Sequence, residues 1–175
     1  MYIIEIDSLA KSFMACAFIG ILNMHIKENR GIIPVYRSSK HMGIRSDLEN
    51  NFDFEIIDEF LDHYSMMVEI MEPLIVDLGN IDRYQRSIEE LFRIFHNIKS
   101  ASGYLQIAPM VRLATLVEDA FEQLRDRDTV VNEETITWLI SVSDVFMQWQ
   151  EDFKMDNELS KIHFSLLILP DMEKA

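Results

Sequence analysis

The chain has 175 residues, a formal net charge of −14 and one cysteine, Cys16. This length accommodates one domain with a substantial core, and an apolar content of 49% excludes wholesale disorder. An acidic protein is a poor candidate for binding nucleic acid or an anionic membrane, because both carry negative charge themselves. A lone cysteine excludes an internal disulfide and a cysteine-cluster metal site.

Residues 1–41 differ in composition from the remainder of the chain. They contain five basic and three acidic residues, a net charge of +2, which leaves −16 on residues 42–175. A short strand, an apolar helix and an edge strand or loop are predicted here, over residues 2–6, 9–24 and 31–36. Because the composition changes at Met42, we treat residues 1–41 as an N-terminal extension. Translation that begins at Met42 is the alternative.

The most apolar stretch of this extension, residues 13–22, is ten residues long. A membrane-spanning helix needs about 20 apolar residues, and Glu5 and Asp7 stand where an export signal would be positively charged. We therefore expect a cytoplasmic protein with no membrane association. Anchoring of the extension to a membrane or to another protein is an alternative, which fractionation of the full-length and Met42-start forms would test.

Four amphipathic segments with helical periodicity follow the extension. Apolar residues recur three and four positions apart in each, which is the spacing of one helix face. The predicted helices cover residues 54–75, 81–104, 109–127 and 133–154. The inward-facing positions of the first are Phe54, Ile57, Phe60, Leu61, Tyr64, Met67, Val68, Met71 and Leu74 or Ile75. Short connections favour an all-α, antiparallel four-helix bundle over residues 42–155. A tail follows at residues 156–175, and its apolar stretch, residues 164–170, either packs back on the bundle or serves a partner.

Residues at the predicted helix boundaries support this division. Asp53 and Asn132 are expected N-caps, whose side chains would accept hydrogen bonds from backbone N–H groups of the first turn. Pro109 suits the first turn of the third helix. Pro73 is expected to kink or shorten the first helix near its end, because proline lacks the N–H that continues the helix.

His96 is the most distinctive residue of the second predicted helix. It lies about 130° from the centre of the apolar stripe, given 3.6 residues per turn, which makes it a surface or boundary residue. Lys99 is one turn further on, Ser100 follows it, and Gly103 is two turns on. A glycine inside a helix costs about 1 kcal/mol relative to alanine, and close approach of another protein would explain Gly103. The helix thus presents an imidazole beside an ammonium group and two small residues, an arrangement suited to holding a phosphoryl group.

Residues 92–100 read F-R-I-F-H-N-I-K-S, Gly103 follows, and Glu118 lies 22 positions after His96. This pattern resembles the histidine phosphotransfer (HPt) domains of two-component phosphorelays, and most of all the N-terminal phosphoryl-accepting domain of chemotaxis histidine kinases. Such domains have a helix with the pattern F-R-x-x-H-x-x-K-G and an acid about 22 positions after the histidine. The likeness covers about residues 53–155. The His–Lys spacing alone is a weak sign of the family, and it becomes specific when it is combined with Glu118 and the four-helix pattern.

The resemblance implies a role for each of these residues. His96 would accept a phosphoryl group on one ring nitrogen. Glu118 would accept a hydrogen bond from the other ring nitrogen, which fixes the tautomer and makes the free nitrogen more electron-rich. Lys99 would attract the phosphoryl oxygens as a point charge. Five further residues would lie where a partner docks: Phe92, Arg93, Ser100, Gly103 and Thr115.

Two positions depart from the family pattern. Ser100 replaces the glycine that usually follows the lysine, at a point where a partner backbone should come close. Thr115 stands 19 residues after His96, where chemotaxis-kinase relatives often have a second histidine, so the tuning of His96 basicity is expected to differ. Ser100 motivates an alternative of another class, a non-catalytic docking module for a receiver or kinase in which His96 is vestigial.

A partner must supply the phosphoryl group, because the sequence has no glycine-rich ATP-binding region, phosphate loop or receiver-type acidic pocket. We expect a phosphotransfer intermediate rather than an autonomous kinase, with a response-regulator receiver domain, a sensor histidine kinase or both as partners. The chain itself would need no cofactor, since Mg²⁺ would come with the receiver. No metal site is expected, because the remaining histidines show no ligand spacing: His25, His41, His63 and His163. The oligomeric state is left open.

Overall fold

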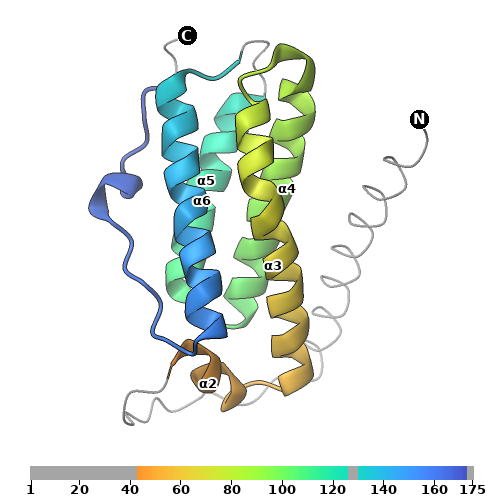
Figure 1. Cartoon of the computed structure of the whole chain (residues 1–175), viewed down its shortest axis with the longest axis vertical. Coiled ribbons are helices and arrows are strands. Elements are labelled where there is room, and N and C mark those ends of the chain that lie inside the picture. Colours follow the sequence, from red (N-terminus) through yellow and green to blue (C-terminus); the bar gives the residue numbers. More distant parts are fainter. Residues whose placement is uncertain (1–42, 126–129, 173–175) are drawn as a thin grey trace, which may run out of the picture.

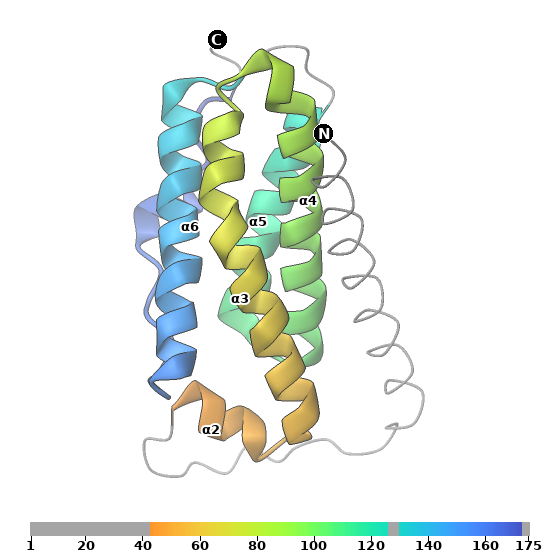
Figure 2. The same ribbon diagram turned by 45° about the vertical axis from the view of Figure 1, so that its right-hand side comes forward.

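The computed structural model describes residues 43–125 and 130–172, a part of the chain that contains helices and no strand. The helices are α2 (Ile44–Glu49), α3 (Phe54–Asp77), α4 (Ile81–Tyr104), α5 (Ala108–Arg125) and α6 (Glu133–Lys154), followed by a 3-10 turn, η1 (Phe164–Leu167). The four long helices, α3 to α6, lie side by side along one axis (Figures 1 and 2). The predicted four-helix bundle is thus confirmed. The strand, helix and edge strand predicted within residues 1–41 lie outside the described residues.

Neighbours in the bundle follow the chain order with short connections. α3 packs against both α4 and α6, and α4 packs against α5. Each long helix runs opposite to the one before it, as short connections require. Among the described helices, none combines the length and the apolar character that crossing a lipid bilayer demands.

Side-chain caps begin two of the long helices. The Asn80 side chain accepts a hydrogen bond from the backbone N–H of Asp82 at the start of α4. The Asn132 side chain accepts one from the N–H of Thr135 at the start of α6, as predicted. Asp53 occupies the N-cap position of α3, but its side chain makes no capping hydrogen bond.

Pro73 does not shorten α3, which continues through it to Asp77. Of the two predicted effects of Pro73, the shortened helix was therefore wrong, and the kink stays a prediction. Proline removes the hydrogen bond that its N–H would have donated to the carbonyl of Glu69. Both residues are exposed, so water can hydrogen-bond that carbonyl in place of the missing N–H. The remaining turn is held by its own apolar contacts with the core, through Ile75.

The core is rich in aromatic side chains that fill the space between the four helices. Its largest fully buried members are Trp149, Tyr64, Tyr84, Phe60, Phe95, Phe121, Phe146 and Phe153. The Tyr64 hydroxyl donates to the carbonyl oxygen of Phe146 at 2.7 Å, and the Tyr84 hydroxyl donates to that of Leu124 at 2.9 Å. Burial raises the pKa of Tyr64 well above its usual value, so the hydroxyl remains a donor.

Phe54 is the one inward-facing prediction for the first helix that the structure contradicts, because its side chain is 56% exposed. It lies in the first turn of α3, where Leu48 and Phe52 of the preceding segment pack on the core. The guanidinium of Arg45 lies over the Phe54 ring at 6.0 Å from the centroid. Periodicity within one helix does not show which apolar residues of a neighbouring segment will cover the core at its end.

The short helix α2 was not predicted from the sequence, and it closes one end of the bundle (Figure 1). The N–H of Ile44 donates to the carbonyl oxygen of Asn157 at 2.9 Å, and the side chain and N–H of Ser46 both bond the Asp156 carboxylate. Gly43 packs against the backbone of Asp156 so closely that a Cβ atom there would overlap it. Six residues are too few for a periodic signal, which is why the pattern did not reveal α2.

The tail after α6 packs back along that helix, which is one of the two arrangements predicted for it (Figure 1). Trp149 donates its indole N–H to the carbonyl oxygen of Ser160 at 2.8 Å, and Trp138 donates to that of Leu166 at 3.2 Å. The Asp152 carboxylate accepts a hydrogen bond from the N–H of Ser160 at 2.7 Å. The two buried indoles thus have their N–H groups satisfied by the tail.

Candidate functional site

The antiparallel packing of α4 against α5 sets which side chains meet across the seam. His96 on α4 faces Glu118 on α5, and two turns toward the start of α4, Glu89 faces Arg125 near the end of α5. A step of seven residues toward the start of α4, from His96 to Glu89, is therefore matched by a step of seven residues toward the end of α5, from Glu118 to Arg125. This register brings together residues that are 22 and 36 positions apart in the sequence.

His96 and Glu118 form the centre of the site. The Nδ1 atom of the imidazole lies 2.8 Å from Oε1 of the carboxylate. The His96 side chain is 49% exposed, whereas that of Glu118 is only 9% exposed. Because an ionised carboxylate can only accept, Nδ1 carries the hydrogen of this bond and the second ring nitrogen, Nε2, keeps its lone pair in the neutral imidazole. The arrangement presents an oriented, nucleophilic nitrogen at the surface.

Lys99 also binds Glu118, through the carboxylate oxygen Oε2 that His96 leaves free. Burial alone would raise the pKa of Glu118, but the hydrogen bonds and charges of Lys99 and His96 outweigh it, so the pKa lies below its usual value. Glu118 is therefore a carboxylate at neutral pH. The sequence suggested Lys99 as a partner for phosphoryl oxygens, and its bond to Glu118 was not foreseen.

The ring of Phe92 lies beside His96 on the same face of α4. The two ring centroids are 6.2 Å apart and the planes are inclined by 16°, an offset stack. Phe92 was predicted as a docking residue, and its contact with the imidazole was missed. The i, i+4 spacing of Phe92 and His96 was a signal that could have indicated it.

The other residues predicted to dock a partner have different surroundings within the bundle. Arg93 is exposed and pairs with Glu90 at 3.3 Å, and Ser100 is half-buried. The Thr115 hydroxyl donates to the carbonyl oxygen of Val111 at 2.8 Å. A Cβ atom at Gly103 would come no closer than 4.0 Å to another side chain, so packing within the bundle does not require glycine there. The glycine leaves room at the surface instead.

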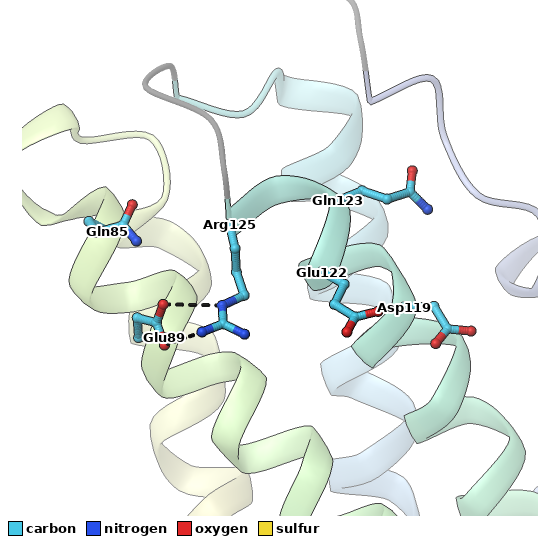
Figure 3. A pocket seen from close by; sticks show the side chains of 6 residues that line it. All are labelled: Gln85, Glu89, Asp119, Glu122, Gln123 and Arg125. Carbon is cyan, nitrogen blue, oxygen red and sulfur yellow. Dashed lines mark hydrogen bonds and ion pairs between the residues drawn. The ribbon is translucent and has the colours of Figure 1, made fainter.

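A shallow groove lies beside this site between α4 and α5, toward the α3–α4 connection. It encloses about 690 Å³ and is lined by Gln85, Glu89, Asp119, Glu122, Gln123 and Arg125. Figure 3 shows Arg125 extending from α5 to Glu89 on α4, with Glu122 and Asp119 along the same side of α5. Three carboxylates and one guanidinium line the groove, and two bonds to Glu89 already engage that guanidinium.

Comparisons with known proteins agree with the geometry. The chain matches the Hpt domain family over residues 55–161, which is well over half of its length. It is 29% identical over 102 residues to a chemotaxis protein CheA of Borreliella burgdorferi. That match covers 58% of this chain but only 12% of the relative, so the chain corresponds to a small part of a much longer protein. No solved structure matches the chain.

The matched residues include α3 from its second residue, all of α4 to α6, and the whole seam that holds His96, Lys99 and Glu118. The predicted resemblance is confirmed on both counts, by the family and by the chemotaxis relative. The chain belongs to the Hpt domain family, the phosphotransfer modules of two-component signalling.

Proposed function

We propose that the chain carries a phosphoryl group on Nε2 of His96 and exchanges it with the aspartates of receiver domains. The observation that carries this proposal is the 2.8 Å contact of His96 Nδ1 with a nearly buried Glu118, which leaves the half-exposed imidazole one free nitrogen. Membership of the Hpt family supports the same chemistry. The similarity to a chemotaxis protein CheA supports a partner from a two-component system, either a receiver or a histidine kinase.

The transfer step follows from the protonation state of the imidazole. The Nε2 lone pair attacks the phosphorus of an aspartyl phosphate, the N–P bond forms, and the P–O bond to the aspartate breaks with its electron pair returning to that carboxylate. The imidazole becomes positively charged and keeps its hydrogen on Nδ1, where the carboxylate of Glu118 stabilises it. Phosphoryl transfer depends mainly on positioning and charge stabilisation, and Glu118 contributes to both. Mg²⁺ belongs to the receiver in this scheme.

Lys99 serves the phosphorylated state in this proposal. In the unmodified protein its ammonium group is bound to Glu118, so it is already held one turn from His96. A phosphoryl group on Nε2 would add negative charge beside it and share the ammonium with the carboxylate. The ion pair with Glu118 therefore holds the Lys99 ammonium group close to His96, and it avoids an unpaired buried charge.

The docking surface is the region around His96, with Arg93, Ser100, Gly103 and Thr115 as its members. Gly103 leaves space that bundle packing does not need, which favours the approach of a partner loop. Ser100 adds a hydroxymethyl group where relatives have glycine. That substitution favours the second candidate, a docking module that binds a receiver or kinase without accepting phosphate.

Transfer from a panel of phosphorylated receiver domains distinguishes the two candidates. We expect an acid-labile, base-stable label on the parent chain, lost in His96→Gln and kept in His163→Gln, which removes an exposed histidine of the tail. Binding of a receiver with no label on the parent chain would support the docking module instead. A label that persists in His96→Gln would contradict the proposed acceptor.

A further inference from the structure

A row of four side chains continues from His96 along the α4–α5 seam. Glu89, Phe92 and His96 occupy successive turns of one face of α4. Arg125 reaches this row from the last turn of α5 (Figure 3). The row therefore connects the imidazole to a charged pair two turns away.

Each neighbour in the row is in contact with the next. Nε and Nη2 of Arg125 bond the two carboxylate oxygens of Glu89 at 3.1 and 3.2 Å. The guanidinium carbon of Arg125 lies 4.6 Å from the centroid of the Phe92 ring, the closer of the two arginine–aromatic contacts in the described residues. The Phe92 ring is in turn stacked on His96 at 6.2 Å.

Two separate constraints therefore act on the imidazole. The hydrogen bond to Glu118 fixes the direction of Nδ1, but it leaves the ring free to tilt about that bond. The nearly parallel ring of Phe92 restricts this tilt and so restricts the direction in which Nε2 points. Phe92 is only half-buried and needs a restraint of its own, which the guanidinium over its face supplies. The bidentate bond to Glu89 holds the otherwise flexible arginine in place.

We propose that Arg125 is a positioning residue for the phosphoryl-accepting imidazole, acting through the ring of Phe92, with Glu89 fixing Arg125. This inference rests on the proposed function, since it assigns a task within the same site. Arg125 touches neither the reacting nitrogen nor the phosphoryl group, so it is not a catalytic residue. The arrangement gives Phe92 a role inside the site in addition to any contact with a partner.

Ring-current shifts of the His96 ring protons report this arrangement directly. A stacked phenyl ring displaces the resonances of the imidazole protons, and a mobile one displaces them less. NMR spectra of the parent chain, Arg125→Gln and Arg125→Lys would be compared, with His96→Gln providing the assignment. The rate of His96 phosphorylation by phosphoramidate would be measured on the same samples. That reagent transfers its phosphoryl group as the P–N bond breaks and ammonia leaves, so no protein partner influences the rate.

Arg45→Gln is the matched control. Arg45 also lies over a phenylalanine ring, that of Phe54, and is also held by carboxylates, those of Glu49 and Asp58. It belongs to α2, at the end of the bundle opposite to the α3–α4 connection (Figure 1). Its loss removes the same kind of contact without touching the row that ends at His96.

We expect Arg125→Gln to move the His96 ring-proton shifts toward those of an unstacked imidazole and to slow phosphorylation about two- to fivefold, the size that a cation–π contact allows. Arg125→Lys keeps the positive charge but lacks the planar group that bonds Glu89 at two points, so it should restore only part of both effects, and Arg45→Gln should change neither. Unchanged ring-proton shifts in a folded Arg125→Gln variant would overturn the positioning role, as would equal changes in Arg45→Gln. A parent chain that phosphoramidate does not phosphorylate would instead contradict the proposed function, while the ring shifts would still decide the role of Arg125.

Discussion

The α3–α6 and α4–α5 seams are built from the same kind of amphipathic helix, and each contains a buried tyrosine hydroxyl that donates to a backbone carbonyl across the seam. Tyr64 bonds Phe146 between α3 and α6, and Tyr84 bonds Leu124 between α4 and α5. The two seams differ at the edge of the core. Between α4 and α5 the Glu118 carboxylate lies at the edge of the core and bonds His96 and Lys99, both of which remain open to water. A buried bond between neutral groups stabilises the fold, whereas a carboxylate at the edge holds reactive groups at the surface.

This difference shows how one bundle can provide both a stable core and an exposed imidazole of fixed orientation. The aromatic side of the core supplies a rigid base, because large rings in close packing resist local movement. The α4–α5 seam can then hold an exposed imidazole in one orientation without burying it. We therefore expect substitutions of buried core residues to change the free energy of unfolding, and substitutions at the His96–Glu118 edge of the α4–α5 seam to change phosphoryl transfer more than stability.

Trp149→Ala should have the largest effect on stability. Trp149 is fully buried, packs edge-on against Phe146 at 5.2 Å and donates its N–H to the tail. Removing a buried aromatic side chain should lower the free energy of unfolding by about 3–5 kcal/mol, measured by urea denaturation. Phe164→Ala, which removes an exposed aromatic side chain, should change it by less than about 0.5 kcal/mol. A loss below about 1 kcal/mol in Trp149→Ala would contradict the proposed division between the buried core and the His96–Glu118 edge.

Glu118→Gln should have the largest effect on phosphoryl transfer among variants that keep His96. The amide can still accept a hydrogen bond from Nδ1, but it no longer offers a negative charge to the imidazolium or to Lys99. We expect the transfer rate to fall about 10- to 100-fold, the range found when a metal-bound histidine loses the group that orients its other ring nitrogen. Stopped or timed transfer from phosphoramidate would measure it. A rate within twofold of the parent would show that orientation by Glu118 is unimportant.

The pH dependence of stability should identify the same carboxylate. The pKa of Glu118 is lower in the folded chain than its ordinary value of 4.5. The folded state therefore gains stability from this group above about pH 4.5, and the gain is lost as the pH falls through the lowered folded pKa. The difference in unfolding free energy between the parent and Glu118→Gln should be constant near pH 7 and should shrink in acid. A difference that is independent of pH from 7 to 3 would contradict this.

Tyr64→Phe should have the smallest effect. It removes one buried hydrogen bond but keeps the ring packed against Phe60 and Phe153. We expect a loss of about 1 kcal/mol in the free energy of unfolding, with no change in the phosphoramidate rate. A slower transfer in this variant would show that the two seams are coupled.

Much of the fold was predictable because the long helices carry strong apolar periodicity and residues that mark their ends. The pairing of His96 with Glu118 was also predictable, through the family pattern of a carboxylate 22 positions after the histidine. The exposure of His96 followed from its angle to the apolar stripe. These features depend on local spacing or on a known motif.

The features that escaped prediction depend on contacts between distant segments. Phe54 lies on the periodic stripe, yet its side chain is exposed while Leu48 and Phe52 pack on the core. The helix α2 is held by a tail residue more than 100 positions away. The approach of Arg125 to Phe92 and Glu89 requires the exact register of α4 against α5. Sequence spacing alone does not predict that Lys99 pairs with Glu118, because spacing allows several partners for this lysine.

The position of the phosphoryl group on His96 tests the central claim most directly. After reaction with phosphoramidate, NMR correlation of the phosphorus with the imidazole protons and nitrogens identifies the substituted nitrogen. Because Nδ1 is bonded to Glu118, the account predicts phosphorylation at Nε2 of His96. Phosphorylation at Nδ1, or on another residue with His96 unmodified, would contradict it.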